Sequence, residues 1–124
     1  MKLSETEEKL MELIWQHKKV FMKELIELHS EPKPAKTTIA TLLKRMQEKK
    51  FVGYTVFGNS RQYFPLVDRQ AYFSNRIGKI IKNYFDDSAL KFASFFATSG
   101  KMTYEELDQL KKMIDDKMKE QKND

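Results

Sequence analysis

The sequence predicts a mainly α-helical protein with one small β-hairpin, and residues 36–66 carry most of this prediction. Their first part has apolar residues at i, i+3, i+4 and i+7, a spacing that places side chains on one face of a helix. These residues are Ile39, Leu42, Leu43 and Met46. The second part has two strand-like runs around Gly58-Asn59-Ser60, whose residue types favour a turn. A helix that leads directly into a hairpin is typical of a winged helix-turn-helix domain.

Two shorter helices are expected before this stretch. Ser4 and Glu7 have the spacing of a capping box, so the first helix should begin at Ser4. Its predicted inner stripe is Leu10, Leu13, Ile14 and His17, flanked by Met11 and Trp15. Residues 18–21 form a short connection in which a brief strand fits. The stripe of the second helix is Met22, Leu25, Ile26 and His29. Pro32 and Pro34 follow it, and proline disfavours helix in the residue before it.

We expect the third helix over residues 35–50 and the hairpin strands over residues 51–56 and 61–66. The face of this helix opposite its apolar stripe carries small hydroxyls and long cations. It presents Thr37, Thr41, Lys44 and Glu48, with Thr38 and Arg45 along one side. Hydroxyl groups can bond to base edges or phosphates, and Arg or Lys can reach guanine acceptors or the DNA backbone. The residue types therefore favour a helix that reads a DNA groove, although a solvated surface would look similar at each single position.

The charge distribution supports this interpretation. The formal net charge is +5 over 124 residues. Residues 1–31 hold five Lys and seven acids, a net charge of −2, whereas residues 32–66 hold seven Lys or Arg and one acid, a net charge of +6. Residues 67–124 hold eleven bases and ten acids. Positive charge is thus concentrated on the predicted DNA-reading unit, as an electrostatic footprint requires.

From Val67 onward the sequence predicts three further helices. The first has a stripe of Phe73, Ile77, Ile80, Ile81 and Tyr84. Asp86-Asp87-Ser88 then breaks it and caps a segment, Ala89 to Ala97, that is apolar nearly all round. Ser99-Gly100 should end that helix, and Thr103 to Glu106 is a second capping box. The last helix has a stripe of Leu107, Leu110, Ile114 and Met118.

Three helices in so short a region cannot bury this much aromatic surface well. The sequence therefore predicts a winged-helix domain over residues 1–67 and a helical dimerisation domain over residues 68–124. Packing of the same apolar residues against the N-terminal half is the alternative. The residues expected at the dimer interface are Ile77, Ile81, Leu90, Phe92, Phe96, Leu107, Leu110 and Ile114.

Composition and motifs argue against several other classes of protein. The chain has no cysteine, which excludes disulfides, thiolate metal sites and cysteine nucleophiles. It shows no signal peptide and no apolar run near the roughly 20 residues of a membrane span, so a cytoplasmic protein is expected. His17 and His29 lie on separate predicted helices, and no phosphate-binding glycine loop, metal-ligand spacing or nucleophile motif occurs. We expect no enzyme, no cofactor and no metal site.

The order of these motifs resembles the penicillinase-repressor family, which includes BlaI, MecI and CopY. Members show a TTV-x-T-x-L-x-RL-x-x-KG-x-V helix and an R-x-Y-x-P-x-V strand. The matching residues of the helix motif are Thr37, Thr38, Ile39, Thr41, Leu43, Arg45 and Met46, and those of the strand motif are Arg61, Tyr63, Pro65 and Val67. The opening helix is similar through Leu3, Glu7, Leu13 and Trp15. The resemblance covers nearly the whole chain.

This resemblance implies a homodimeric transcriptional repressor that binds double-stranded DNA at an inverted-repeat operator. The third helix would enter the major groove and the hairpin would lie along the backbone. The DNA-binding residues that it implies are Lys36, Thr37, Thr38, Thr41, Lys44, Arg45 and Arg61, with Lys33 as a further candidate.

The sequence departs from the family pattern in two places. CopY-type members sense copper through C-terminal cysteines, which this chain lacks, so that route is excluded. Members that control β-lactam resistance are cut by a membrane-bound sensor protease at an Asn-Phe bond in the penultimate helix. Here Ser94, Phe95 and Phe96 occupy the aligned region, so the helix matches but the cut-site residue does not.

Two other functions use the same features. A winged-helix protein-interaction module would present the third helix to an acidic protein partner. Steep salt dependence and sequence preference in duplex binding would separate that function from DNA reading. A small-molecule-responsive regulator of the MarR type would place a ligand pocket among the aromatic residues, which core packing also explains.

Overall fold

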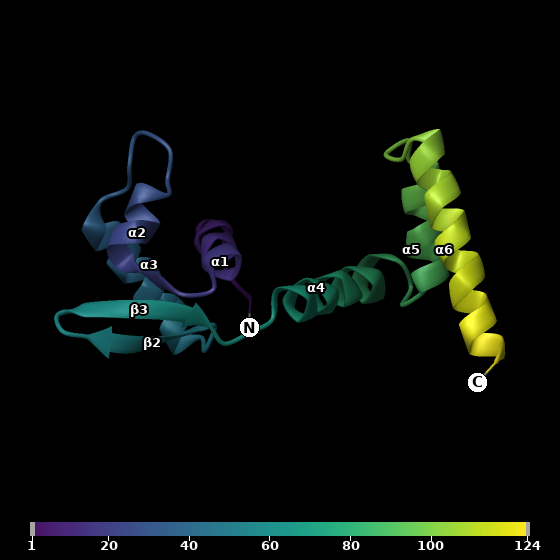
Figure 1. Cartoon of the computed structure of the whole chain (residues 1–124). Helices are drawn as coiled ribbons and strands as arrows, with labels where there is room; N and C mark the ends of the chain where they lie inside the picture. Colours follow the sequence, from purple (N-terminus) through teal and green to yellow (C-terminus); the bar gives the residue numbers. More distant parts are fainter. Residues whose placement is uncertain (1, 124) are drawn as a thin grey trace. The chain divides into compact units, whose positions relative to one another are not determined.

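The computed structural model describes residues 2–123 and contains six helices and three strands within that range (Figure 1). Their order is α1 (Glu5–His17), β1 (Val20–Phe21), α2 (Met22–Glu27), α3 (Lys36–Glu48), β2 (Val52–Phe57), β3 (Ser60–Pro65), α4 (Arg69–Tyr84), α5 (Ala89–Thr98) and α6 (Tyr104–Lys122). The chain divides into two compact units, Met1–Ser74 and Asn75–Asp124. The mainly helical fold with a hairpin wing is as the sequence predicts.

Helix α1 begins as its capping box predicts, but its buried stripe differs from the expected one. The Ser4 hydroxyl accepts a hydrogen bond from the Glu7 amide at 3.2 Å, and the Ser4 amide donates to Glu7 Oε1 at 2.8 Å. Residues Glu7, Leu10, Met11 and Ile14 are buried. The prediction of an inward-facing His17 was wrong. It lies in the last turn, at the edge of this stripe, and is exposed to solvent.

Helix α3 supplies the centre of the core. All four residues of its predicted stripe, Ile39, Leu42, Leu43 and Met46, are buried. They pack with residues of α1, with Leu25 of α2 and with Val52 and Tyr63 of the sheet. Helix α2 is shorter than its predicted stripe, because it ends at Glu27 and the last position of the stripe, His29, lies beyond the helix. His29 is half-buried there, with Nδ1 at 2.7 Å from the Leu25 carbonyl oxygen.

The sheet has three antiparallel strands in the order β1-β3-β2. The brief strand expected within residues 18–21 is present as β1, in which Val20 pairs with Tyr63 of β3. Strands β2 and β3 form the predicted wing, in which Tyr54 pairs with Tyr63 and Phe57 with Ser60. The turn therefore consists of two residues, and Gly58 has a φ of +61°, which suits glycine.

A Schellman motif ends α3 and sends the chain into the wing. The Phe51 amide donates to the Met46 carbonyl at 2.9 Å, and the Lys50 amide donates to the Gln47 carbonyl at 2.9 Å. Lys50 has a φ of +66°, in the left-handed region where glycine is the usual residue. The family motif has glycine at this point, so the chain keeps the backbone geometry with a less suitable residue.

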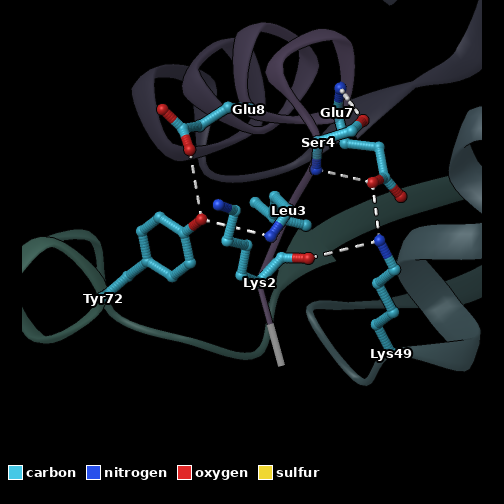
Figure 2. A network of polar contacts seen from close by, with 7 residues as sticks. All are labelled: Lys2, Leu3, Ser4, Glu7, Glu8, Lys49 and Tyr72. Carbon is cyan, nitrogen blue, oxygen red and sulfur yellow. Dashed lines mark hydrogen bonds and ion pairs between the residues drawn. The ribbon is translucent and has the colours of Figure 1, made fainter. Parts of the chain in front are cut away.

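A polar network joins the start of α1 to the end of α3 and the start of α4 (Figure 2). Glu7 is 1 % exposed and accepts a hydrogen bond from Lys49 Nζ at 2.7 Å. Lys49 Nζ also lies 3.3 Å from the carbonyl oxygen of Lys2. The Tyr72 hydroxyl accepts from the Leu3 amide at 3.2 Å and donates to Glu8 Oε2 at 3.1 Å. Three helices are thus fixed to one another through two carboxylates, Glu7 and Glu8, and the Tyr72 hydroxyl.

The start of α4 belongs to the first unit. The ring of Tyr72 lies 5.5 Å from that of Phe51 and 5.8 Å from that of Trp15, and Phe73 also lies 5.8 Å from Trp15. Trp15 Nε1 donates to the Val67 carbonyl at 2.7 Å. This compact unit therefore extends to Ser74, seven residues beyond the boundary that the sequence predicts at residue 67.

The second unit has the caps that the sequence predicts but no interior. Ser88 caps α5 by accepting from the Lys91 amide at 3.1 Å, and Thr103 and Glu106 form the capping box of α6. The ring centre of Phe85 lies 5.4 Å from the ring centres of both Phe92 and Phe95. No side chain between residues 75 and 123 is buried. Within the described part of the chain, no helix combines the length and apolar character needed to cross a membrane.

Loss of the Lys49 ammonium should destabilise the first unit. Lys49→Ala leaves the buried Glu7 carboxylate without its cation, and we expect the free energy of unfolding to fall by about 2 to 3 kcal/mol. This is less than for a fully buried pair, because the Lys49 side chain is 28 % exposed and water can partly replace it. Urea denaturation at pH 7 measures the loss. Lys112→Ala, which removes an exposed ion pair with Asp108, should cost less than about 1 kcal/mol.

The same pair predicts a pH dependence. Burial raises the pKa of Glu7, but the hydrogen bonds from Lys49 and Ser4 and the Lys49 charge lower it more, so its pKa lies below the ordinary 4.5. A lowered pKa contributes stability above the ordinary value, and this contribution is lost as the pH falls through the folded-state pKa. The difference between the wild-type protein and Lys49→Ala should therefore shrink below about pH 4.5. An unchanged difference at pH 3 would contradict this role.

Candidate nucleic-acid interface

Helix α3 presents the predicted contact residues on its open side. Because the apolar stripe is buried, Lys36, Thr37, Thr38, Thr41, Lys44 and Arg45 are all exposed. The Thr41 hydroxyl donates to the Thr37 carbonyl oxygen at 2.9 Å, so its proton is used within the helix. Its oxygen lone pairs remain free to accept, which suits amino groups on the edges of adenine or cytosine.

The first turn of α3 is suited to an anion. Its N-cap is Ala35, which offers no side-chain cap, and the turn contains no acidic residue. Backbone N–H groups at a helix start point outward and carry a partial positive charge. Lys36 stands at this end and adds a full charge. The chemistry favours a phosphate at this end of the helix.

Arg61 occupies a fixed position on the wing. Strand β3 places it diagonally across from Tyr54 of β2, two residues before the Tyr54 partner Tyr63. Its guanidinium carbon lies 4.3 Å from the centre of the Tyr54 ring, within the range of a cation–π contact. The Tyr54 ring itself lies 5.7 Å from that of Tyr63, which is buried. Arg61 is therefore supported by a pair of aromatic rings, Tyr54 and Tyr63, of which the second belongs to the core.

A hollow of about 970 Å³ separates α3 from the wing and reaches α2. Of the predicted residues, Lys36, Lys44 and Arg61 line it. The three threonines and Arg45 lie outside its lining, on the adjoining side of α3. The hollow is also lined by Lys23 of α2, which sequence reasoning missed. Only the placement of α2 beside the wing distinguishes Lys23 from other exposed lysines, and no sequence pattern reports that placement.

The cations of this surface have no acidic partners within residues 2–123. Lys23, Lys36, Lys44, Arg45 and Arg61 take part in none of the ion pairs there. Their charge is therefore available to an external anion.

Lys33, the further candidate, has a local contact. Its ammonium donates to the carbonyls of Glu27 and His29 at 2.9 and 2.8 Å, which closes the end of α2.

The residues predicted for dimerisation and cleavage lie in the second unit. Leu90 is 80 % exposed, Ile114 is 50 % exposed and Phe92 is half-buried against Phe85. Ser94, Phe95 and Phe96 lie inside α5 and are exposed, and the Thr98 hydroxyl donates to the Ser94 carbonyl at 2.8 Å. The roles of these residues in dimerisation and cleavage stay predictions.

Comparisons with known proteins agree with this architecture. The sequence pattern of the penicillinase repressor family matches residues 3–116 of this chain. The solution structure of the DNA-binding domain of the repressor BlaI is similar to this chain, with a TM-score of 0.51 and 29 % sequence identity. The match covers 57 % of this chain and 88 % of that domain. No curated protein matches. Since the family match spans nearly the whole chain, the protein belongs to the penicillinase repressor family.

Proposed function

We propose that this protein is a sequence-specific DNA-binding repressor that acts as a homodimer on an inverted-repeat operator. The observation that carries the proposal is the exposed side of α3, where three threonines and three cations stand, and the cations have no acidic partners in the described part of the chain. Membership of the repressor family and the similarity to the BlaI DNA-binding domain support the same function.

Base reading and backbone contact fall to different residues. Thr37, Thr38, Thr41 and Arg45 are proposed to face the major groove, because they are exposed on α3, with Thr37 and Thr41 opposite the buried stripe and Thr38 and Arg45 along one side. Lys36, Lys44 and Arg61 surround the hollow beside the wing and are proposed to contact phosphates. Phosphate contacts hold the protein in register, whereas contacts with base edges supply sequence preference.

The second unit supports a dimer through its lack of an interior. Its helices carry large apolar side chains, yet none of its described residues is buried. A second copy of the same surface would cover the proposed interface residues, which come from α4, α5 and α6. These are Ile77, Ile81, Leu90, Phe92, Phe96, Leu107, Leu110 and Ile114. Two linked reading units would then bind two half-sites with a gain of about 10²- to 10⁴-fold over separate units.

Release by proteolysis is proposed at Ser94, Phe95 and Phe96, with a membrane-bound sensor protease as the partner. The three residues are exposed, but they are helical, so a protease must first unwind part of α5. Cleavage there would separate α6 from the reading unit. The loss of paired half-site binding would then release the operator.

The dimer proposal predicts a dependence on half-site spacing. Two reading helices related by a two-fold axis require half-sites about one helical turn apart or a multiple of that distance. Binding-site selection from random duplexes should recover an inverted repeat. Insertion of 5 bp between the half-sites should then sharply weaken binding, whereas insertion of 10 bp should restore part of it. Equal affinity for all three spacings would show that the two units do not bind together.

Substitutions in α3 and the wing should have different effects. Thr41→Ala or Arg45→Ala should weaken operator binding by roughly 1 to 3 kcal/mol and relax the preference at one base pair. Arg61→Ala should weaken specific and non-specific binding alike and flatten the salt dependence by about one unit per protomer. Titrations with the selected duplex and with mixed-sequence DNA measure the specific and non-specific affinities of each variant. If Arg61→Ala relaxed sequence preference and the helix variants did not, the two roles would have to be exchanged.

Substitution or truncation within α5 should cause the dimer to dissociate. Phe92→Ala should weaken dimerisation by roughly 3 to 5 kcal/mol if the ring is packed in the interface. A fragment that ends at Phe95 should sediment as a monomer and bind the operator far more weakly, while its first unit stays folded. Lys117→Ala, on an exposed face of α6, is the control and should leave the dimer intact. A fragment that remained dimeric and bound the operator as tightly as the whole chain would exclude cleavage there as the switch.

A further inference from the structure

The hollow between α2, α3 and the wing collects cations from three separate elements. Lys23 comes from α2, Lys36 and Lys44 from α3, and Arg61 from β3. Glu48 is the only acidic residue among the described residues that line it. None of the four cations is in an ion pair within residues 2–123. Positive charge concentrated in a hollow raises the local concentration of anions there.

The arrangement fits an extended polyanion better than a single small one. The cations stand on different walls of a space of about 970 Å³, far more than one phosphate fills. The hollow also adjoins the side of α3 that carries Thr37, Thr41 and Arg45. A nucleic-acid strand whose bases face α3 would therefore have its phosphates beside the hollow.

Tyr54 controls the direction of the wing cation. Its ring holds the Arg61 guanidinium at 4.3 Å and is itself supported by the buried Tyr63 at 5.7 Å. A guanidinium held over the face of a ring still has N–H donors free for phosphate oxygens. An unsupported arginine would lose more side-chain freedom when it binds.

We propose that this hollow holds the sugar–phosphate backbone of one DNA strand, with Lys23 as a phosphate contact and Tyr54 as the residue that positions Arg61. The inference rests on the proposed function, because the strand belongs to the operator duplex. It adds α2 to the DNA-binding surface and assigns a binding role to an aromatic residue that does not itself need to touch DNA.

Lys23 is tested against a lysine with the same charge on another surface. The probes are an inverted-repeat duplex selected from random sequences and a mixed-sequence duplex of equal length, each titrated over a range of salt concentrations. Lys23→Ala should weaken binding to both by about three- to tenfold and flatten the salt dependence by about 0.9 per protomer. Lys9→Ala, exposed on α1, should change neither by as much. If the two variants had equal effects, Lys23 would act only through the net charge of the protein and not as a phosphate contact.

Tyr54 is tested by keeping or removing its ring. Tyr54→Phe should bind as the wild-type protein does. Tyr54→Leu and Tyr54→Met should lose affinity and salt dependence as Arg61→Ala does. Combining Tyr54→Leu with Arg61→Ala should be no worse than Arg61→Ala alone, since both changes remove one contact. Thermal unfolding of each variant identifies any loss of fold. A folded variant without the ring that kept the wild-type salt dependence, or additive losses in the double variant, would overturn the positioning role.

The outcomes separate this inference from the proposed function. If the wild-type protein bound neither duplex, the proposed function would fail. If it bound the selected duplex and Thr41→Ala relaxed its preference, the proposed function would stand. Suppose that, in that case, Lys23→Ala and the variants without the Tyr54 ring each bound with the salt dependence of the wild-type protein. That result would reject only the proposal that the DNA backbone lies in the hollow.

Discussion

A helix with one apolar stripe can bury only one side, and this constraint on α3 determines most of the first unit. The burial of Ile39, Leu43 and Met46 against α1, α2 and the sheet fixes which residues face outward. The threonines and cations are exposed because their positions in the helix leave no alternative. The Glu7–Lys49 pair and the Schellman motif then hold the far end of α3, so that the wing leaves it in a defined direction. The reading surface is a consequence of the core.

Local patterns allowed much of this fold to be predicted from the sequence. Capping at Ser4 and Thr103, the stripe of α3 and the hairpin all depend on residues close together in the chain. The prediction failed for His17, because an apolar pattern does not say where the centre of a buried face lies. The first unit continues to Ser74 because Tyr72 packs against Phe51, a contact between distant residues that no local period reports.

The candidate site divides in the same way. The residues of α3 and Arg61 follow from helical spacing and from the family resemblance, and the structure finds them exposed. Lys23 and Tyr54 could not be selected from the sequence, because their importance comes from the placement of α2 and β2 around one hollow. Lys33 has a contact that the sequence did not indicate. Its ammonium closes the end of α2 through two carbonyl groups. Residue type indicates chemistry, and only packing decides where that chemistry is used.

The absence of buried side chains between residues 75 and 123 has a consequence for the amount of protein that a cell maintains. In the proposed dimer, the interior of this unit exists only when two copies meet, so its stability depends on their concentration. A copy without a partner exposes apolar helices, and such chains are continually removed by proteases. Small reductions in synthesis would then reduce the active population more than proportionally. The gene's response to dosage would be steep even before any inducing signal acts.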